Sequence, residues 1–290
     1  MRPYTGFVLP LLLLAATAEA GTRVQFRTTL GDFYLELFDE DKPVTVANFL
    51  RYVNEGAYED SFFHRMVPNF VIQGGLGTTV HRGATNASVA YITTHAQITN
   101  EFHVGTFYSN VAGTIAMAKT ADPNSATSQF FINLMDNSSS LDKTNNSGGF
   151  TVFGRVIGDT NILAKLNNFD DFGADTNRHS NFVVNAGSPF GELPVTQLRT
   201  NKSGNLYVDF DDLIYVDVSA LAVQISTPAA GGHQVTWNRS DRGTNIVEFT
   251  TQFPPSWSTL TNLPAGAGTI SVIDPSALTN RFYRVRIQKP

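Results

Sequence analysis

The sequence predicts a mainly β protein in which a closed antiparallel β-barrel with two helices precedes a small β-sandwich. Three observations support this fold class. Short apolar strands follow one another from about residue 22 to residue 220. Only two stretches in that range repeat apolar residues at helical spacing, which argues against regularly alternating strands and helices. Beyond a turn-rich stretch at 228–232, four further alternating strands occur without a helical pattern.

The composition excludes several classes of protein. Of the 290 residues, 42% are apolar and 16% are charged, which suits about two folded domains with buried cores. The formal net charge of −5 argues against nucleic-acid binding, because such proteins normally present a basic face. Cysteine is absent and the six histidines lack the spacing of zinc ligands, so we expect no metal and no cofactor. A monomer is the default expectation.

The first 20 residues have the pattern of a secretory signal peptide. Arg2 precedes an apolar run at 7–16, and Ala18-Glu19-Ala20 has small residues at the two positions that signal peptidase reads. The run is too short to cross a bilayer, which takes ~20 apolar residues. We therefore expect cleavage after Ala20, export to a periplasm or to the cell exterior, and no transmembrane anchor.

The first elements of the barrel are predicted to be a hairpin and a helix. Residues 24–28 and 33–38 alternate on either side of a turn. Apolar residues then recur at i, i+3, i+4 and i+7 from Val46, with Pro43 suited to the first turn and Gly56 to a C-terminal stop. We expect a helix between Pro43 and Gly56.

The later patterns divide the chain into domains. Residues 76–100 are polar and indicate a long surface excursion, and a second helix is predicted at about 159–167. The C-terminal strands are predicted at 234–237, 246–250, 269–273 and 282–287. The predicted parts are a signal peptide at 1–20, a barrel domain at 21–220, a hinge at 221–232 and a small β-sandwich module at 233–290. We interpret the last part as a spacer or adhesion module.

Two regions carry the residues of chemical interest. The first is Ser61-Phe-Phe-His-Arg-Met-Val-Pro-Asn-Phe-Val-Ile-Gln-Gly-Gly75, and the second combines Gly113-Thr-Ile-Ala-Met-Ala-Lys-Thr-Ala121 with Ser125-Ala-Thr-Ser-Gln-Phe-Phe-Ile-Asn133. Alternation places Arg65 among apolar neighbours. Taken alone, this pattern suits an arginine whose stem lies on apolar surface and whose charged head reaches water. Alternation also predicts that Phe130 and Ile132 face the core and leaves Phe131 as the candidate for a pocket, although an aromatic residue taken alone is more often part of a core.

These regions closely resemble the signature of cyclophilins, in which Phe-His-Arg, a following Phe and Gln-Gly-Gly occur at the same spacing. Gly-Thr-Ile-Ala-Met-Ala and Ser-Gln-Phe-Phe-Ile follow in the expected order, and Val152-Phe-Gly-Arg-Val156 matches a later core strand. The resemblance covers about residues 22–218 and looks like the bacterial branch. It implies an eight-stranded closed antiparallel barrel capped by two α-helices. It also implies peptidyl-prolyl cis/trans isomerase activity on proline-containing peptides and on folding exported proteins.

The resemblance implies a site with one catalytic residue, Arg65. It assigns substrate binding to His64, Phe70, Val71, Gln73, Ala118, Lys119, Gln129, Phe131, Leu141 and Phe150. Four of these would form the apolar pocket for the proline ring: Phe70, Val71, Phe131 and Leu141. Gln73 would hydrogen-bond Arg65 or the substrate carbonyl, and backbone atoms around Ala118 and Lys119 would pair with the peptide. From its own position, His64 could equally be a packed, hydrogen-bonded histidine.

Two alternatives to this interpretation differ in plausibility. The first is a Ser/His/Asp hydrolase, but the sequence lacks the strand–turn–helix elbow that presents the nucleophile in such an enzyme. A secreted peptide-binding or adhesion protein that keeps the barrel without turnover stays open. Ser140 stands where many eukaryotic relatives of the resembled family carry a Trp, so we expect weak cyclosporin binding with catalysis preserved.

Overall fold

A computed structural model of the chain describes residues 21–290 except 85, 159, 172–180, 221–222, 229–230, 239–243, 253–254, 265, 267–268, 277–280 and 289–290. The predicted signal peptide at 1–20 lies outside the described residues, as do parts of the predicted hinge. Among the described residues, no helix is both long and apolar enough to cross a membrane.

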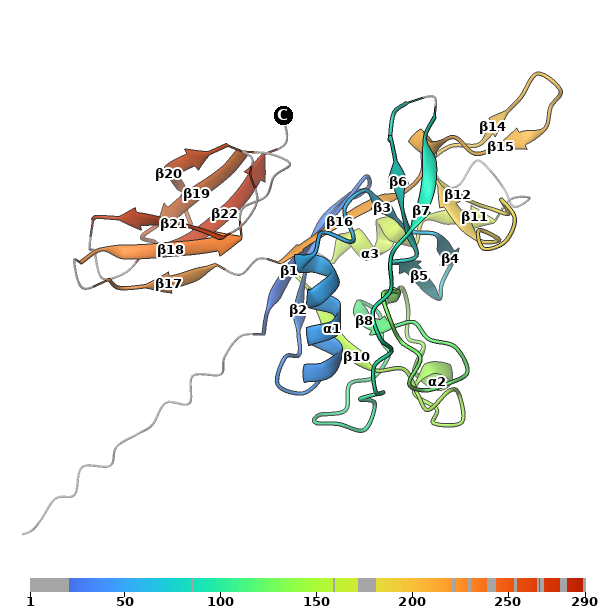
Figure 1. Cartoon of the computed structure of the whole chain (residues 1–290), viewed down its shortest axis with the longest axis horizontal. Coiled ribbons are helices and arrows are strands. Elements are labelled where there is room, and N and C mark those ends of the chain that lie inside the picture. Colours follow the sequence, from blue (N-terminus) through green and yellow to red (C-terminus); the bar gives the residue numbers. More distant parts are fainter. Residues whose placement is uncertain are drawn as a thin grey trace, which may run out of the picture.

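The first part of the chain forms one antiparallel sheet that curls around α1 and α3 (Figure 1), and eight strand positions of this sheet make up the barrel. The strands are β1 Arg23–Thr28, β2 Gly31–Leu37, β3 Ser61–Phe62 running on into β4 Arg65–Val67, β5 Val71–Gly74, β8 Thr114–Met117, β9 Phe130–Asn133, β10 Val152–Ile157 and β16 Tyr215–Ala220. Neighbours follow the order β4-β5-β9-β8-β10-β2-β1-β16-β3. This arrangement confirms the predicted fold class.

The barrel closes at residues 61–67, because that segment changes its partner strand halfway along. The Phe63 N–H donates to the carbonyl of Ile214, at 3.0 Å, just before β16. The His64 N–H donates to the carbonyl of Gln73 in β5, also at 3.0 Å. One continuous segment therefore supplies both the first and the last strand position of the barrel. Phe63 and Met66 both lie in the main core, although an odd spacing would put them on opposite faces of a regular strand.

The two predicted helices are present and cover the barrel core. They are α1 Pro43–Asn54 and α3 Asn161–Leu166, and a short third helix, α2 Ser138–Leu141, was not predicted. In α1, the ring of Phe49 lies 6.2 Å from that of Phe26 and 5.6 Å from that of Phe130, centroid to centroid. The first amides of α1 are capped from a distant loop, because Glu101 accepts from the Thr45 N–H at 2.7 Å.

Two excursions from the barrel contain more structure than their sequences indicate. The stretch predicted as a surface excursion holds a hairpin, β6 Gly77–Val80 and β7 Ser88–Tyr91, which extends the sheet from β3. Residues 167–214, here called the interposed segment, separate α3 from β16. They form β11 Phe169–Asp171, β12 Asn181–Val184, β13 Leu193–Val195, β14 Arg199–Thr200, β15 Leu206–Tyr207 and the 3₁₀-helix η1 Phe210–Asp212.

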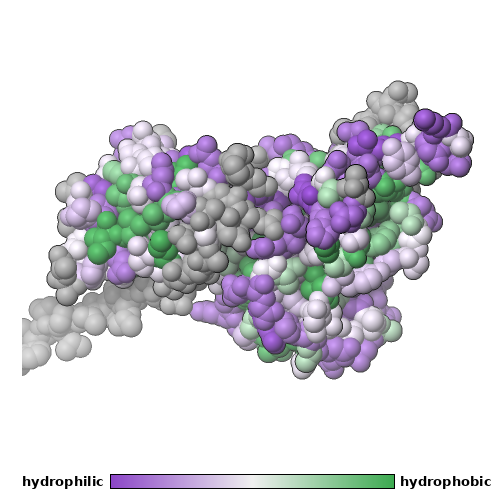
Figure 2. Space-filling model, turned by 45° about the horizontal axis from the view of Figure 1, so that its top comes forward, coloured by the Kyte–Doolittle hydropathy of each residue, from purple (hydrophilic) through white to green (hydrophobic). Residues whose placement is uncertain are grey.

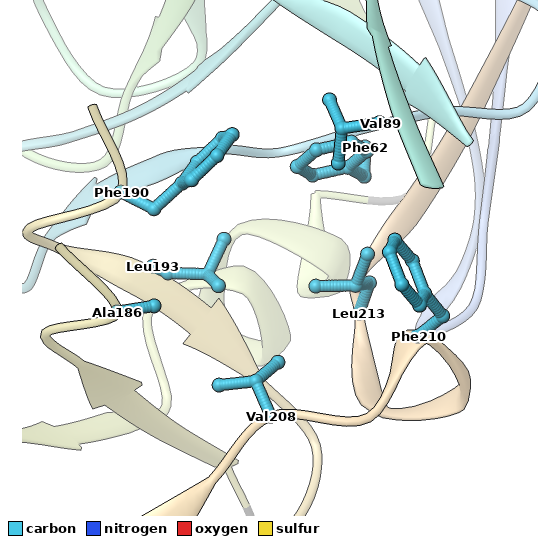
Figure 3. A pocket seen from close by; sticks show the side chains of 8 residues that line it. All are labelled: Phe62, Val89, Ala186, Phe190, Leu193, Val208, Phe210 and Leu213. Carbon is cyan, nitrogen blue, oxygen red and sulfur yellow. The ribbon is translucent and has the colours of Figure 1, made fainter. Parts of the chain in front are cut away.

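The interposed segment packs against β3 and the hairpin through a second apolar cluster. Its buried members are Phe62, Val184, Leu193, Val195, Leu213 and Tyr215. The packing is incomplete and leaves a cavity of about 200 Å³. Apolar side chains from β3, β7 and the interposed segment point into this cavity (Figure 3): Phe62, Val89, Ala186, Phe190, Leu193, Val208, Phe210 and Leu213.

The C-terminal part is a small β-sandwich of two three-stranded sheets. Its strands are β17 Gln224–Ser226, β18 His233–Asn238, β19 Thr244–Thr250, β20 Ser258–Leu263, β21 Thr269–Asp274 and β22 Phe282–Gln288. Val235 and Trp237 of one sheet and Val247 of the other are buried in the same cluster, so the two sheets pack face to face. The predictions missed β17 and β20, because neither shows a clear apolar alternation.

Apolar residues also reach the surface of both parts. On the face shown in Figure 2, they form separate patches bordered by polar residues. Large exposed apolar side chains come from unrelated elements, including Tyr91 in β7, Phe107 in a loop and Ile273 in β21. Hydropathy alone therefore marks no single interaction surface on this face.

The Gln-Gly-Gly turn supplies a test of barrel packing. Gly75 has φ +81°, and an added Cβ would collide with the carbonyl oxygen of Ser128. We expect Gly75→Ala to lower the free energy of unfolding by about 3 kcal/mol, from backbone strain and overpacking together. Gly83 has φ +79° but open space around it, so Gly83→Ala is the matched control and should cost about 1 kcal/mol.

The measurement must report on unfolding of the barrel. Tryptophan fluorescence would not do so, since both tryptophans, Trp237 and Trp257, lie in the C-terminal part. Hydrogen exchange of the β1 and β2 amides under native conditions gives the opening free energy of the barrel strands. An equal loss of opening free energy in Gly75→Ala and Gly83→Ala would contradict the close approach of Gly75 to the carbonyl of Ser128.

Candidate active site

A compact apolar cluster lies outside the main core, on the outer side of β5, β8, β9 and β10. Its buried members are Val71, Ala116, Phe131, Leu141 and Val152, and Phe38, Phe70, Tyr108, Ala118 and Phe150 pack against them. Phe130 and Ile132 lie in the main core, as alternation along β9 predicts. The structure thus brings together six residues that the sequence assigns to a site: Phe70, Val71, Ala118, Phe131, Leu141 and Phe150.

Aromatic rings form much of this cluster, which is the candidate for the predicted proline pocket and is called the pocket from here on. Phe131 is buried, whereas Phe70 and Phe150 are partly exposed at its edge. The rings of Phe131 and Phe150 meet edge to face, with centroids 5.7 Å apart and planes at 69°. Aromatic walls in this arrangement can hold a small apolar ring and orient whatever is attached to it.

The strand register places a charged group in line with this pocket. Arg65 of β4 pairs with Gln73 of β5, Gln73 pairs with Phe131 of β9, and Phe131 pairs with Ala116 of β8. Residues at directly paired positions of neighbouring strands face the same side of a sheet. The guanidinium of Arg65 and the apolar pocket therefore share one face of the barrel, two strands apart.

The partner of Arg65 was not predicted. Its Nε lies 2.6 Å from Oε2 of Glu192 in the interposed segment, and the two side chains are 37% and 45% exposed. Gln73, for which a bond to Arg65 was one expectation, instead donates from Nε2 to Oε1 of Gln129 at 2.8 Å. No local sequence signal connects Glu192 to Arg65, because the contact depends on how the interposed segment docks.

His64 is a buried neutral group. It is 4% exposed, and its Nδ1 has no hydrogen-bond partner. Burial, with a smaller contribution from the Arg65 charge, lowers the pKa of His64 to about 4, although a hydrogen bond with Gln129 opposes the shift. At neutral pH the imidazole carries no charge. Of the two adjacent residues, only Arg65 is therefore a cation.

Lys119 and Ala118 border the pocket on its other side. The Lys119 Nζ lies 4.1 Å from the ring centroid of Phe150 and donates to the carbonyl of Ser147. Burial lowers the pKa of Lys119 to about 8, with Asp122 opposing the shift. The Ala118 N–H donates to the carbonyl of Gln129 at 2.9 Å, so this amide is engaged within the barrel and is not open to a bound peptide.

A buried polar network fixes the short helix α2, which carries Leu141, and the sequence reasoning missed it. Asn137 donates from Nδ2 to the carbonyl of Phe70 and to Oδ1 of Asn133, each at 2.8 Å. Asn110 donates to Asp142 from both its backbone N–H, at 3.0 Å, and its Nδ2, at 2.8 Å. Because these groups are mostly buried and mutually satisfied, they hold two walls of the pocket together.

The groups at this site can provide electrostatic stabilisation and an apolar binding surface. Among the residues that the structure describes, no group of three or more His, Cys, Asp or Glu is arranged to hold a metal ion. The charge at the pocket is a guanidinium, which stays protonated and offers its donors in a planar fork. The arrangement suits a reaction in which charge or a lone pair develops beside a bound apolar ring.

Comparisons with known proteins point in the same direction. The sequence model described as cyclophilin type peptidyl-prolyl cis-trans isomerase/CLD matches residues 23–188. A peptidyl-prolyl cis-trans isomerase of Acinetobacter baylyi is 40% identical over 169 residues, which are 58% of this chain and 84% of that protein. The isomerase B of Escherichia coli is 38% identical over 149 residues, 49% of this chain and 82% of that protein.

A further bacterial relative is similar to this chain, and the family match leaves part of the barrel uncovered. An isomerase of Streptomyces antibioticus is 44% identical over 135 residues, 46% of this chain and 75% of that protein. The family match ends at residue 188, short of the resemblance inferred from the motifs. The barrel itself continues further, because β16 pairs with both β1 and β3.

The low pKa of His64 predicts a pH dependence of stability. Its pKa is about 4 in the folded protein against a usual value of 6.5, so between these values the unfolded chain binds more protons. The free energy of unfolding should therefore fall by about 3 kcal/mol from this group as the pH drops from about 6.5 to about 4. His64→Gln removes the titration, and the exposed His103→Gln is the control.

The measurement is urea unfolding of the three proteins at a series of pH values. The difference between wild type and His64→Gln should narrow or reverse toward acid pH, while His103→Gln follows wild type throughout. A wild-type profile parallel to that of His64→Gln would show that the buried imidazole does not titrate as the structure implies.

Proposed function

Since the chain belongs to the cyclophilin-type peptidyl-prolyl cis-trans isomerases, we propose that Arg65 and the pocket around Phe131 form its active site. The observation that carries the proposal is the strand register, which aligns Arg65, Gln73 and Phe131 on one face. In this proposal the pocket holds the ring of a substrate proline, and the guanidinium acts on the bond that precedes it.

The chemistry requires no covalent step. An X-Pro peptide bond rotates over a barrier of ~20 kcal/mol, because its nitrogen is conjugated with the carbonyl. Rotation breaks this conjugation, and the nitrogen becomes pyramidal with a localised lone pair. A guanidinium N–H aimed at that nitrogen donates more strongly to the lone pair of the twisted state than to the planar amide. Arg65 thereby stabilises the transition state more than the ground state, which is the condition for catalysis.

The neighbouring groups support this role of Arg65. His64 is neutral at pH 7 and so does not compete as a second cation. Phe131 and Leu141 are buried, and the network of Asn137 and Asp142 holds the backbone around Phe70 and Leu141, so the groups that would contact the ring are fixed before substrate binds. When the proline ring is held in place, the substrate can still rotate its acyl side about the X-Pro bond.

Export is the second part of the proposal. The positively charged start, the short apolar run and the Ala18-Glu19-Ala20 site support removal of residues 1–20 during secretion. The mature enzyme would then act on proline-containing segments of exported proteins as they fold. A peptide-binding or adhesion role without turnover is the competing possibility, and a site that only bound peptides would not need a guanidinium in register with the pocket.

Substitution of Arg65 tests the proposed mechanism. Arg65→Ala should lower kcat/KM on a proline-containing test peptide by about 10- to 100-fold, since it removes a hydrogen bond from a charged donor worth about 1.5–3 kcal/mol. Arg155→Ala is the matched control, because this barrel arginine is 61% exposed and pairs with Glu36 on β2. A coupled cis/trans assay measures both variants beside wild type.

The outcome separates the enzyme from the binding protein. Wild-type protein that binds proline peptides without accelerating their isomerisation would support the non-catalytic role. An Arg65→Ala variant with the activity of wild type would rule out the assigned mechanism even if the protein is an isomerase.

Processing of the N-terminus tests export. In a secreting bacterial host, the mature protein should begin at Gly21 by N-terminal sequencing, because only small residues fit the positions at Ala18 and Ala20. Ala18→Lys should block processing and leave the full-length precursor. Glu19→Lys is the matched control, since the middle position of the site is not read. Recovery of an unprocessed wild-type chain from the cytoplasm would contradict the proposal.

A further inference from the structure

The interposed segment brings a carboxylate to the residue proposed to be catalytic. Oε2 of Glu192 lies 2.6 Å from Nε of Arg65. The backbone of Glu192 is attached at the same place, because its carbonyl accepts from the Met66 N–H at 2.7 Å. Main chain and side chain of one residue therefore contact two successive residues of β4.

Glu192 is also held from behind. Its chain neighbour Leu193 is 3% exposed and belongs to the apolar cluster that joins the interposed segment to β3. Leu193 points into the apolar cavity of that cluster, together with Phe190 and Phe62 (Figure 3). The carboxylate therefore projects from an anchored backbone, not from a free loop, which limits how far it can move from Arg65.

The contact leaves part of the guanidinium unused. A carboxylate at Nε engages the side of the planar group, whereas the two terminal nitrogens carry the other four N–H donors. Gln73, which is paired with Arg65 across the strands, donates to Gln129 instead. We propose that Glu192 is a positioning residue, which fixes Arg65 through Nε so that its terminal nitrogens face the substrate. This inference rests on the proposed catalytic role of Arg65.

The expected effect is modest and falls on one kinetic constant. Both side chains are partly exposed, and exposed ion pairs contribute little because water screens them and ordering opposes them. Loss of positioning should therefore cost about two- to fivefold in rate. Since Arg65 acts in the transition state and the apolar pocket binds the ring, the loss should appear in kcat, while KM stays close to that of wild type.

The experiment compares three variants of the full mature chain in the proline-peptide assay. Glu192→Ala removes the carboxylate but keeps the backbone carbonyl that anchors Met66, so the segment can still dock. Glu192→Gln retains an oxygen that can accept from Nε and should keep more than half of the wild-type kcat. Asp211→Ala removes an exposed acidic side chain elsewhere in the interposed segment and should match wild type. Equal unfolding free energies for all three variants exclude a folding defect.

A double-substitution cycle shows whether Glu192 acts through Arg65. Adding Glu192→Ala to Arg65→Ala should cause no further loss, because the group to be positioned is gone. The Nε–H signal of Arg65 in an NMR spectrum provides a second readout. That proton should exchange slowly in wild type and in Glu192→Gln, and rapidly in Glu192→Ala.

Several results would overturn the inference. Wild-type kcat in Glu192→Ala, a change in KM alone, a faster enzyme, or an equal fractional loss in the Arg65→Ala background would each exclude a positioning role. If Arg65→Ala is impaired and Glu192→Ala is not, the positioning role fails and the proposed function stands. Full activity of Arg65→Ala would overturn the proposed function and the positioning role together.

Discussion

The partner change within residues 61–67 is the constraint on which the rest of the structure depends. Up to Phe63 this segment bonds to the β16 side of the sheet, and from His64 it bonds to β5. Because both ends of the sheet use the same stretch of chain, the barrel closes without an additional strand. The change of partner also breaks the alternation of the side chains along this segment. Met66 therefore lies in the core, as Phe63 does, and Arg65 lies on the outer side of the barrel, beside the pocket.

The proposed active site follows from what is attached to that segment. On one side, β5 and β9 continue the row from Arg65 through Gln73 to Phe131, which gives the charge and the apolar pocket a common face. On the other side, the interposed segment packs on β3 and carries Glu192 to Arg65. The closure of the barrel, the pocket and the ion pair thus all depend on one short stretch of backbone, which contacts β16, β5 and the interposed segment.

Much of this could be predicted from the sequence, because it depends on local periodicity and on motifs. The helix at 43–54 and the alternation of Phe130, Phe131 and Ile132 are of this kind. Other features could not, since their partners lie far apart in the chain. Glu101 caps α1 from a distant loop, and the hairpin at 77–91 is polar enough that its pairing with β3 leaves little trace in the pattern.

The sequence by itself determined the family, the barrel with its two helices, and the set of residues expected at the pocket. The barrel and its helices follow from periodicity, and the family and the pocket residues follow from motifs that resemble those of cyclophilins; both are properties of short stretches. Only the tertiary structure decided which groups those residues contact. Gln73 bonds to Gln129, while Arg65 pairs with Glu192, because the docking of the interposed segment determines which acceptor comes within hydrogen-bond distance. Burial, which no local pattern measures, likewise made His64 a neutral group.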